Sequence, residues 1–223
     1  MKEQAGEKPK RTPARQAEQY YSPHPVAASH PRLIRFTFRQ QEFVFLTGSS
    51  VFSKGHVDPG TELLLSTLPL PLSGRVLDLG CGYGPIGIVV AAVSPAALVT
   101  MVDVNERAVA LARANVVKNS LPAGMVEVVA ADGSEFLVRV AGEGTGFDYV
   151  LTNPPIRAGK EVIFRWIEGA RAALKPQGEF YLVARTSQGA KSFFAHMQQV
   201  FGPSHCALVE RGGGFRVLRA SRA

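Results

Sequence analysis

A run of apolar residues that leads into three closely spaced glycines limits the fold more than any other feature of the chain. The run Val76–Gly87 reads Val-Leu-Asp-Leu-Gly-Cys-Gly-Tyr-Gly-Pro-Ile-Gly. Its first four residues fit a buried strand, the glycines fit a tight turn, and Pro85 fits the first turn of a helix. A strand, a glycine turn and a helix in this order bind adenosine-containing cofactors in parallel α/β sheets.

Strand and helix patterns alternate from this run to the end of the chain. Strands are expected at 75–79, 98–102, 126–130, 148–152 and 179–184, and helices at 85–93, 106–118 and 160–174. A further helix at 188–201 and closing strands at 206–210 and 215–220 complete the pattern. Strongly apolar strands between helices are typical of a parallel sheet that is covered on both faces. We therefore predict an α/β, Rossmann-like fold with a seven-stranded, mostly parallel sheet.

Two short apolar segments, 33–38 and 43–46, precede the main pattern and are separated by a polar turn. They predict an N-terminal β-hairpin, which a helix at 61–68 follows. Residues 1–31 offer little to bury, so a basic, flexible arm is expected there. The expected organisation is the arm (1–31) and one α/β domain (32–223), made of the hairpin (32–47) and the main core (48–223).

Positive charge gathers near both ends of the chain. Lys and Arg total 25 against 18 Asp and Glu, which gives a net charge of +7. Residues 1–40 are rich in bases, and the last residues carry Arg211, Arg216, Arg219 and Arg222 with no acid among them. Clustered bases gain affinity for polyanions by releasing counterions. Both ends are therefore predicted to contact phosphates.

Membrane, secreted and metal-binding classes are disfavoured. No apolar run approaches the roughly 20 residues that cross a bilayer, and the polar N-terminus is not a secretory signal. Cys81 and Cys206 have neither the number nor the spacing of a disulfide framework or a zinc site. We expect a cytoplasmic protein with no bound metal and no membrane partner.

Carboxylates stand at the ends of three predicted strands. Asp78 precedes the glycine turn, where it would attract the ammonium group of a methionine moiety. Asp103 ends the next strand and can accept both ribose hydroxyls. Asp132, followed by Gly133, can accept from an adenine amino group, and a plain turn is the alternative. Together with the glycine turn, these carboxylates predict an S-adenosylmethionine site.

A dinucleotide site competes with this interpretation. The segment Gly82–Gly87 matches GxGxxG, and Asp103 lies about twenty residues further on, as in nicotinamide enzymes. However, Asp78 would repel a pyrophosphate, and the match leaves Gly80 without a role. We therefore favour S-adenosylmethionine.

A rigid polar turn, Asn153-Pro-Pro-Ile156, follows the predicted strand at 148–152. Proline at 154 and 155 restricts the turn and removes two backbone donors. The amide oxygen of Asn153 and the carbonyl of Pro154 can then accept both hydrogens of an –NH₂ group and align its lone pair with a methyl donor. Positioning of this kind supplies most of the acceleration of an in-line displacement.

These residues make the chain resemble the class I methyltransferases, and more narrowly the short, single-domain form of the bacterial small-subunit (16S) rRNA guanine-N2 methyltransferase family. The resemblance covers about residues 33–220. It is carried by Val51–Gly55, Asp58–Thr61, Val76–Gly87, Val102–Asn105, Asp132–Gly133 and Asn153–Lys160. It implies that Phe52 and Ser53 close over the pocket and that Asn153 to Ile156 hold the guanine amine. Longer members of the family carry a degenerate duplicate of the domain.

The residues after the prolines bear on the substrate. DNA adenine and release-factor glutamine methyltransferases usually have an aromatic residue where this chain has Ile156, which packs against a base but cannot stack as a ring does. Arg157 and Lys160 suit a neighbouring phosphate, and solvated surface charge is the alternative.

The expected site is therefore defined by residue. The catalytic residues are Asn153 and Pro154. The cofactor contacts are Asp78, Gly80, Cys81, Gly82, Gly84, Asp103, Val104, Asp132, Gly133 and Asn153. The substrate contacts are Phe52, Ser53, Pro155, Ile156, Arg157 and Lys160.

The predicted activity is methylation of a guanine N2 amine in ribosomal RNA, with that RNA or the small ribosomal subunit as partner. Two alternatives stay open. One is methylation of a protein amide or of DNA adenine, and the other is a catalytically idle RNA-binding or assembly factor.

Overall fold

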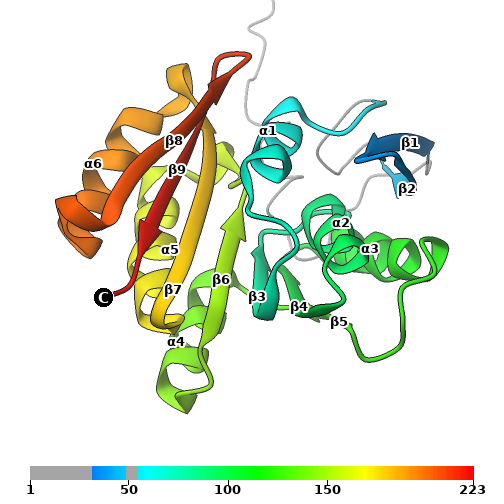
Figure 1. Cartoon of the computed structure of the whole chain (residues 1–223), viewed down its shortest axis with the longest axis horizontal. Helices are drawn as coiled ribbons and strands as arrows, with labels where there is room; N and C mark the ends of the chain where they lie inside the picture. Colours follow the sequence, from blue (N-terminus) through cyan, green and yellow to red (C-terminus); the bar gives the residue numbers. More distant parts are fainter. Residues whose placement is uncertain (1–31, 49–54) are drawn as a thin grey trace, which may run out of the picture.

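The glycine-turn strand lies inside a seven-stranded sheet in the computed structural model, which describes residues 32–48 and 55–223 (Figure 1). The strands are β3 (Ser73–Leu79), β4 (Ala96–Asp103), β5 (Val126–Ala130), β6 (Phe147–Thr152), β7 (Leu174–Arg185), β8 (Cys206–Gly212) and β9 (Phe215–Ser221). Their order across the sheet is β5-β4-β3-β6-β7-β9-β8. Strands β3 to β7 pair in parallel, whereas β9 is antiparallel to both β7 and β8. The predicted Rossmann-like fold is confirmed.

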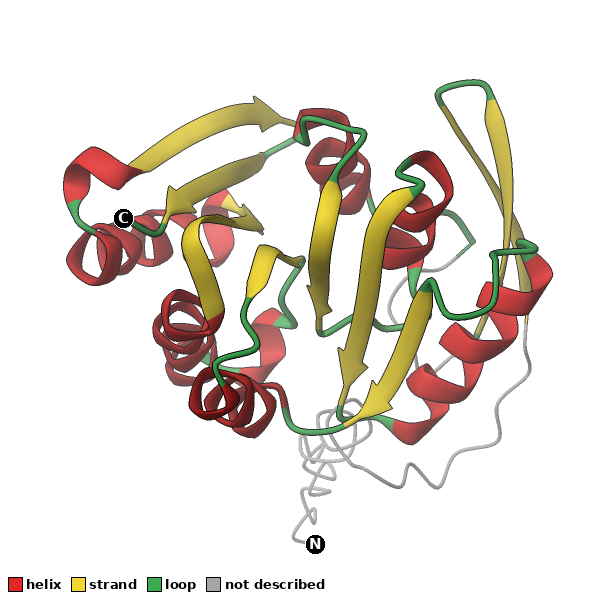
Figure 2. Ribbon diagram, turned by 60° about the horizontal axis from the view of Figure 1, so that its bottom comes forward, coloured by secondary structure: helices red, strands yellow, loops and turns green. Residues whose placement is uncertain are grey.

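Helices cover both faces of this sheet (Figure 2). One face packs against α1 (Pro59–Thr67), α2 (Pro85–Val93) and α3 (Glu106–Lys118). The other packs against α4 (Gly133–Glu143), α5 (Lys160–Ala173) and α6 (Ala190–Phe201). Short 3₁₀ turns lie at Ile156–Ala158, Thr186–Gln188 and Pro203–His205. Each face has its own apolar core, and this explains why the central strands are apolar throughout.

The chain leaves β3 in one direction across the sheet, towards β4 and β5, and later returns on the other side with β6 and β7. Such a reversal opens a crevice at the carboxyl ends of the strands, where ligands bind. The turn after β3 and the turn after β6 therefore lie side by side at the carboxyl ends of these central strands.

The predicted hairpin consists of β1 (Arg32–Phe38) and β2 (Gln41–Thr47), which form a separate two-stranded sheet. Asn115 of α3 and Asn119, which caps the C-terminus of that helix one turn later, attach the outer edge of β2. Asn115 accepts from Leu46 N at 2.7 Å and donates to Leu46 O at 2.9 Å. Asn119 does the same with Val44, at 3.0 and 2.9 Å. Side-chain amides thus take the place of a neighbouring strand.

Two local features differ from the sequence prediction. Helix α4 was not predicted, although Asp132 caps it and Phe136, Leu137 and Val140 have helical spacing. Its amphipathic stretch follows the Asp-Gly pair directly, and that pair reads equally well as a plain turn. Strand β7 begins at Leu174, earlier than the expected 179, because its irregular start pairs with Phe147 beside a register shift.

Candidate active site

A cavity of about 400 Å³ opens at the carboxyl ends of the central strands. This volume lies in the usual range for small-molecule sites. Most of the predicted site residues line it: Gly80, Cys81, Gly82, Asp103, Val104, Asp132, Gly133, Asn153, Pro154, Pro155 and Arg157. Residues from Gly80 to Arg157, up to 77 positions apart in sequence, thus share one pocket.

Four predicted residues do not line the cavity: Asp78, Gly84, Ile156 and Lys160. Asp78 is fully buried beneath the turn, and Ile156 packs against the core between the sheet and α5. Lys160 is exposed at the start of α5. Phe52 and Ser53 lie outside the described residues. The roles of these six, like those of the residues that line the cavity, stay predictions.

The glycine turn is held against the neighbouring strand. The backbone amides of Gly80 and Cys81 donate to Val102 O at 2.8 and 3.0 Å. Gly80, Gly82 and Gly84 have φ values of 72°, 57° and 89°, a region that favours glycine. The turn therefore needs its glycines for conformation, independently of any ligand.

Trp166 of α5 forms a wall of the cavity that the sequence analysis did not assign, because its helical spacing favoured the core. It is only 6 % exposed, so it is both a core residue and a pocket residue. A Cβ on Gly80 would lie 2.8 Å from the indole, and a Cβ on Gly133 would lie 2.9 Å from it. Both turns thus rest against one aromatic ring, and neither position has room for a side chain.

Asp103 reaches from the end of β4 into the turn. Its two carboxylate oxygens accept from Gly82 N at 2.9 Å and from Asn105 N at 2.8 Å. Burial raises the pKa of Asp103, although these backbone hydrogen bonds oppose the shift. A carboxylate has about four acceptor positions, so both oxygens can still accept from a ligand diol.

Asp78 is buried directly behind the glycine turn. Its Oδ2 accepts from Gly87 N at 2.9 Å and so ties the first turn of α2 to β3. Its Oδ1 is buried and has no hydrogen-bond partner among the described residues. Burial is the main cause that raises the pKa of Asp78 to about 7. An unpaired buried oxygen of this kind suits a nearby cation.

Asp132 caps α4 at the opposite wall. Its Oδ1 accepts from Ser134 N at 2.8 Å and from Glu135 N at 3.1 Å. Its second oxygen has no hydrogen-bond partner among the described residues, and its side chain is exposed on the cavity.

Cys81 is a free, buried thiol whose pKa is raised by burial, so it stays protonated and unreactive.

The amide of Asn153 is held in one orientation by two residues at the start of α1. Its Nδ2 donates to Asp58 Oδ1 and to Thr61 Oγ1, both at 3.0 Å. Asp58 is itself fixed as the cap of α1, since it accepts from Gly60 N at 2.9 Å. With both amide hydrogens used, Oδ1 of Asn153 is left as the acceptor for a ligand. The sequence analysis named Asp58 and Thr61 only within a motif of resemblance.

Within the parts of the chain that the structure describes, no three His, Cys, Asp or Glu side chains are grouped so that they could hold a metal ion. The helices there are also too short or too polar to span a membrane.

Comparisons with known proteins agree with this geometry. The family model described as "Methyltransferase small domain" matches residues 42–219. A Bacillus subtilis (strain 168) protein described as "Uncharacterized protein YbxB" is 35% identical over 207 residues, which are 92% of this chain and 99% of that protein. Ribosomal RNA small subunit methyltransferase C of Pasteurella multocida is 37% identical over 164 residues, 72% of this chain but 46% of that protein.

Among solved structures, the T. thermophilus 16S rRNA N2 G1207 methyltransferase (RsmC), in complex with AdoMet and guanosine, aligns with a TM-score of 0.75 at 27% identity. The alignment covers 90% of this chain and 52% of that one. The chain thus spans about half the length of the two named methyltransferases, and nearly all of the Bacillus protein. Because the family model matches most of the length of this chain, the chain belongs to the methyltransferase small domain family.

Proposed function

We propose that this protein transfers a methyl group from S-adenosylmethionine to the exocyclic N2 amine of a guanine in ribosomal RNA, with small-subunit RNA as the target. The observation that carries the proposal is the fixed amide of Asn153, whose Nδ2 is held by Asp58 and Thr61 at the rim of the cavity. The two methyltransferases named above, one of which is described with AdoMet and guanosine, support the choice of donor and acceptor.

The residues present fit S-adenosylmethionine. Gly80 and Gly133 pack against Trp166 with no room for a side chain, and all three residues line the cavity of about 400 Å³, a usual volume for a small-molecule site. Asp103 would accept the ribose hydroxyls and Asp132 the adenine amino group. Asp78, with its unpaired buried oxygen, would balance the ammonium group from behind the turn. When bound, the cofactor supplies an electrophilic methyl group on a sulfonium.

The chain's own part in the reaction is to bind and orient the amine. Asn153 Oδ1 accepts one hydrogen of the –NH₂ group, and the Pro154 carbonyl accepts the other. The nitrogen lone pair then faces the methyl group, and alignment of reacting atoms contributes up to roughly 7–11 kcal/mol in favourable cases. The proton of the aminium formed leaves to water, so no separate base is required. Pro155 and Trp166 give the cavity apolar lining beside this turn.

The test is an assay with S-adenosylmethionine that carries a labelled methyl group, offered separately to RNA, DNA and protein fractions. We expect label in small-subunit ribosomal RNA and N2-methylguanosine after nucleoside mass spectrometry. Asn153→Ala should lower the rate by roughly 10²-fold, because the acceptor amine loses its alignment. Label in protein or DNA would favour the alternative acceptors. An unchanged effect of Asn153→Ala in cells would favour an idle assembly factor.

A nicotinamide dinucleotide is tested at the same time. S-adenosylhomocysteine should raise the melting temperature of the protein, whereas NAD should not, because Asp78 lies behind the turn where a pyrophosphate would bind. A cytoplasmic location follows if ribosomal RNA is the substrate.

A further inference from the structure

The end of the sheet at which the pocket opens carries negative charge on one half and positive charge on the other. The segments after β4 and β5, residues 103–107 and 132–135, carry four acids (Asp103, Glu106, Asp132 and Glu135) against Arg107. These segments surround the expected place of the cofactor, which carries a net positive charge. The other half of this end of the sheet carries positive charge.

On that other half, the topology gathers six bases from segments far apart in sequence. Strands β6 and β7 end there, and β9 begins there because it is antiparallel to β7, with Arg185 paired to Phe215. The β8–β9 turn therefore lies beside the start of α6 at the top of Figure 1. We call this surface the basic edge: it comprises Arg157, Lys160, Arg185, Lys191, Arg211 and Arg216. The acids within its segments are Glu161 and Glu210.

The positive charge of the basic edge is not neutralised within the described residues. Arg185 lies 4.2 Å from the centroid of the Phe215 ring, and Arg216 donates to Thr186 Oγ1 at 3.1 Å. Neither contact involves a carboxylate. Glu210 uses Oε1 to accept from the backbone of Arg211 rather than to pair with its guanidinium. These contacts fix guanidinium groups in place and leave their charge available.

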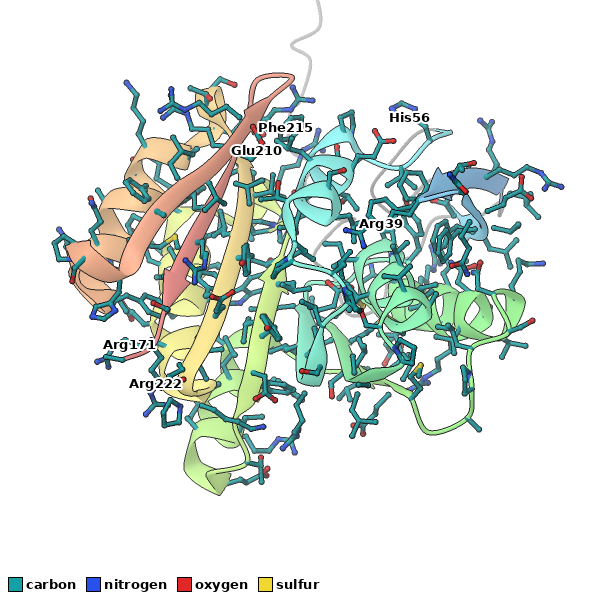
Figure 3. The ribbon with its side chains drawn as sticks, viewed as in Figure 1. Arg39, His56, Arg171, Glu210, Phe215 and Arg222 are labelled. Carbon is teal, nitrogen blue, oxygen red and sulfur yellow. The ribbon has the colours of Figure 1, made fainter. Side chains whose placement is uncertain are left out.

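Two other arginines near the C-terminus behave differently. Arg219, only three residues after Arg216 in β9, pairs with Glu179. Arg222 donates to the backbone carbonyls of Ala172 and Leu174. Figure 3 places Arg222 and Arg171 at the end of the molecule opposite to Phe215 and Glu210. The basic C-terminal residues thus divide, and only Arg211 and Arg216 lie on the pocket side.

We propose that the basic edge binds the phosphates of the RNA strand that flanks the target nucleotide. It starts at the pocket itself, since Arg157 lines the cavity, and extends over the ends of β7 and β9 away from the acidic half. A polyanion whose base enters the pocket is thereby directed to one side of it. The proposal rests on the proposed function for the identity of the polyanion.

The experiment compares two double variants of the full chain that remove the same charge. Lys191→Gln with Arg211→Gln alters the basic edge at two exposed side chains. Lys118→Gln with Arg171→Gln alters exposed bases at the far ends of α3 and α5. Binding of a fluorescent transcript of small-subunit ribosomal RNA is measured with S-adenosylhomocysteine present, over a range of salt concentrations.

The basic-edge variant should bind the transcript on the order of tenfold more weakly at low salt. Its slope of log affinity against log salt should shrink by about 1.5, since each lost phosphate contact removes about 0.7–0.9. The control variant should stay within about twofold of the wild type. Equal losses in the two variants, or wild-type binding by the basic-edge variant, would overturn the proposal.

Thermal stabilisation by S-adenosylhomocysteine should be the same in both variants, which shows that fold and pocket are intact. Failure of the proposed function is recognised separately. If the wild type methylates no RNA while the basic-edge variant alone loses RNA affinity, the methylation proposal fails and the basic edge stands. Unchanged RNA binding together with loss of an acidic protein partner would assign the surface to a protein instead.

Discussion

At the scale of single residues, the amide of Asn153 depends on two side chains that make no part of its own turn. Asp58 and Thr61 accept its two hydrogens and thereby decide which atom faces the cavity. An asparagine whose amide is not held can turn over and present its –NH₂ group instead of its oxygen. We therefore treat Asp58 and Thr61 as positioning residues.

Thr61→Val tests this role without removing the cap of α1. The valine keeps the volume of threonine but leaves one Asn153 hydrogen unpaired, so kcat should fall about tenfold while affinity for S-adenosylhomocysteine stays unchanged. Thr61→Ser retains the hydroxyl and should recover most of the rate. Steady-state kinetics on the RNA substrate measure both variants. Equal activity of the serine and valine variants would contradict the positioning role.

Asp78 gives a prediction about pH. Its pKa in the folded protein, about 7, lies above the ordinary value of 3.8, so the folded state favours the neutral carboxyl. The stability that this preference contributes is complete below about pH 4 and is lost as the pH rises through 7. Relative to Asp78→Asn, the wild type should lose up to about 4 kcal/mol of unfolding free energy over this range. Urea denaturation of both proteins at several pH values measures the difference, and a difference that is constant with pH would refute the prediction.

At the scale of elements, the start of α4 and the turn after β3 share the indole of Trp166. Gly133→Ala places a Cβ 2.9 Å from that ring, so something must shift. We expect Gly133→Ala to lower the free energy of unfolding by about 1–3 kcal/mol and to weaken the binding of S-adenosylhomocysteine.

Gly142 is the matched control in the same helix, since a Cβ there meets nothing within 4 Å. Gly142→Ala should stabilise the protein by about 0.5–1 kcal/mol and leave cofactor affinity unchanged. Denaturation and ligand titration of both variants measure these effects. A Gly133→Ala variant as stable as Gly142→Ala would show that Trp166 moves freely.

The elements were largely predictable because their signals are local. The helices at 85–93 and 106–118 and the strand at 126–130 have their expected bounds, since each has a clear apolar pattern and the helices have Pro85 or Asn105 at their start. Helix α4 was missed because Asp132, two residues after β5, is both a pocket residue and the cap of the helix. One carboxylate with two roles so close to a strand gives a pattern that resembles a plain turn.

The sequence predicted only those pocket residues that lie in the turns directly after strands. Gly80, Asp103 and Asn153 stand directly after apolar strands, and parallel strands bring their ends together. Trp166 and Thr61 reach the cavity from helices, and their direction is set by how α5 and α1 pack on the sheet. Helical spacing identifies the buried face of a helix, but it does not tell which end of that face meets a ligand.

At the scale of the whole molecule, the hairpin is joined to the core by apolar packing and by two asparagine amides rather than through a continuous sheet. Asn115 also donates to Tyr83 O in the glycine turn at 2.9 Å, so it connects the hairpin with the cavity. Asn119 donates its remaining hydrogen to Asn115 O within α3. The two asparagines hold the same strand but differ in their link to the pocket.

This difference separates the effects of two substitutions. Asn115→Ala and Asn119→Ala should each lower the unfolding free energy by about 1–3 kcal/mol, because backbone groups of β2 lose their partners. Only Asn115→Ala should also weaken S-adenosylhomocysteine binding, because only it releases the carbonyl of Tyr83. Urea denaturation and ligand titration measure the two effects. Equal losses of ligand affinity would place the link to the pocket elsewhere.

The amides that attach β2 also bear on self-association. An unpaired strand edge is a template for aggregation. The outer backbone of β2 is already bonded at Val44 and Leu46. Strand β1, which within the described residues pairs with β2 alone, carries exposed Arg32 and also Arg35, which forms an ion pair with Glu42 of β2. Charged, hydrated side chains on an edge strand oppose the addition of another chain. The small sheet is therefore shielded from further strand addition by occupied hydrogen-bonding groups on one border and by hydrated charged side chains on the other.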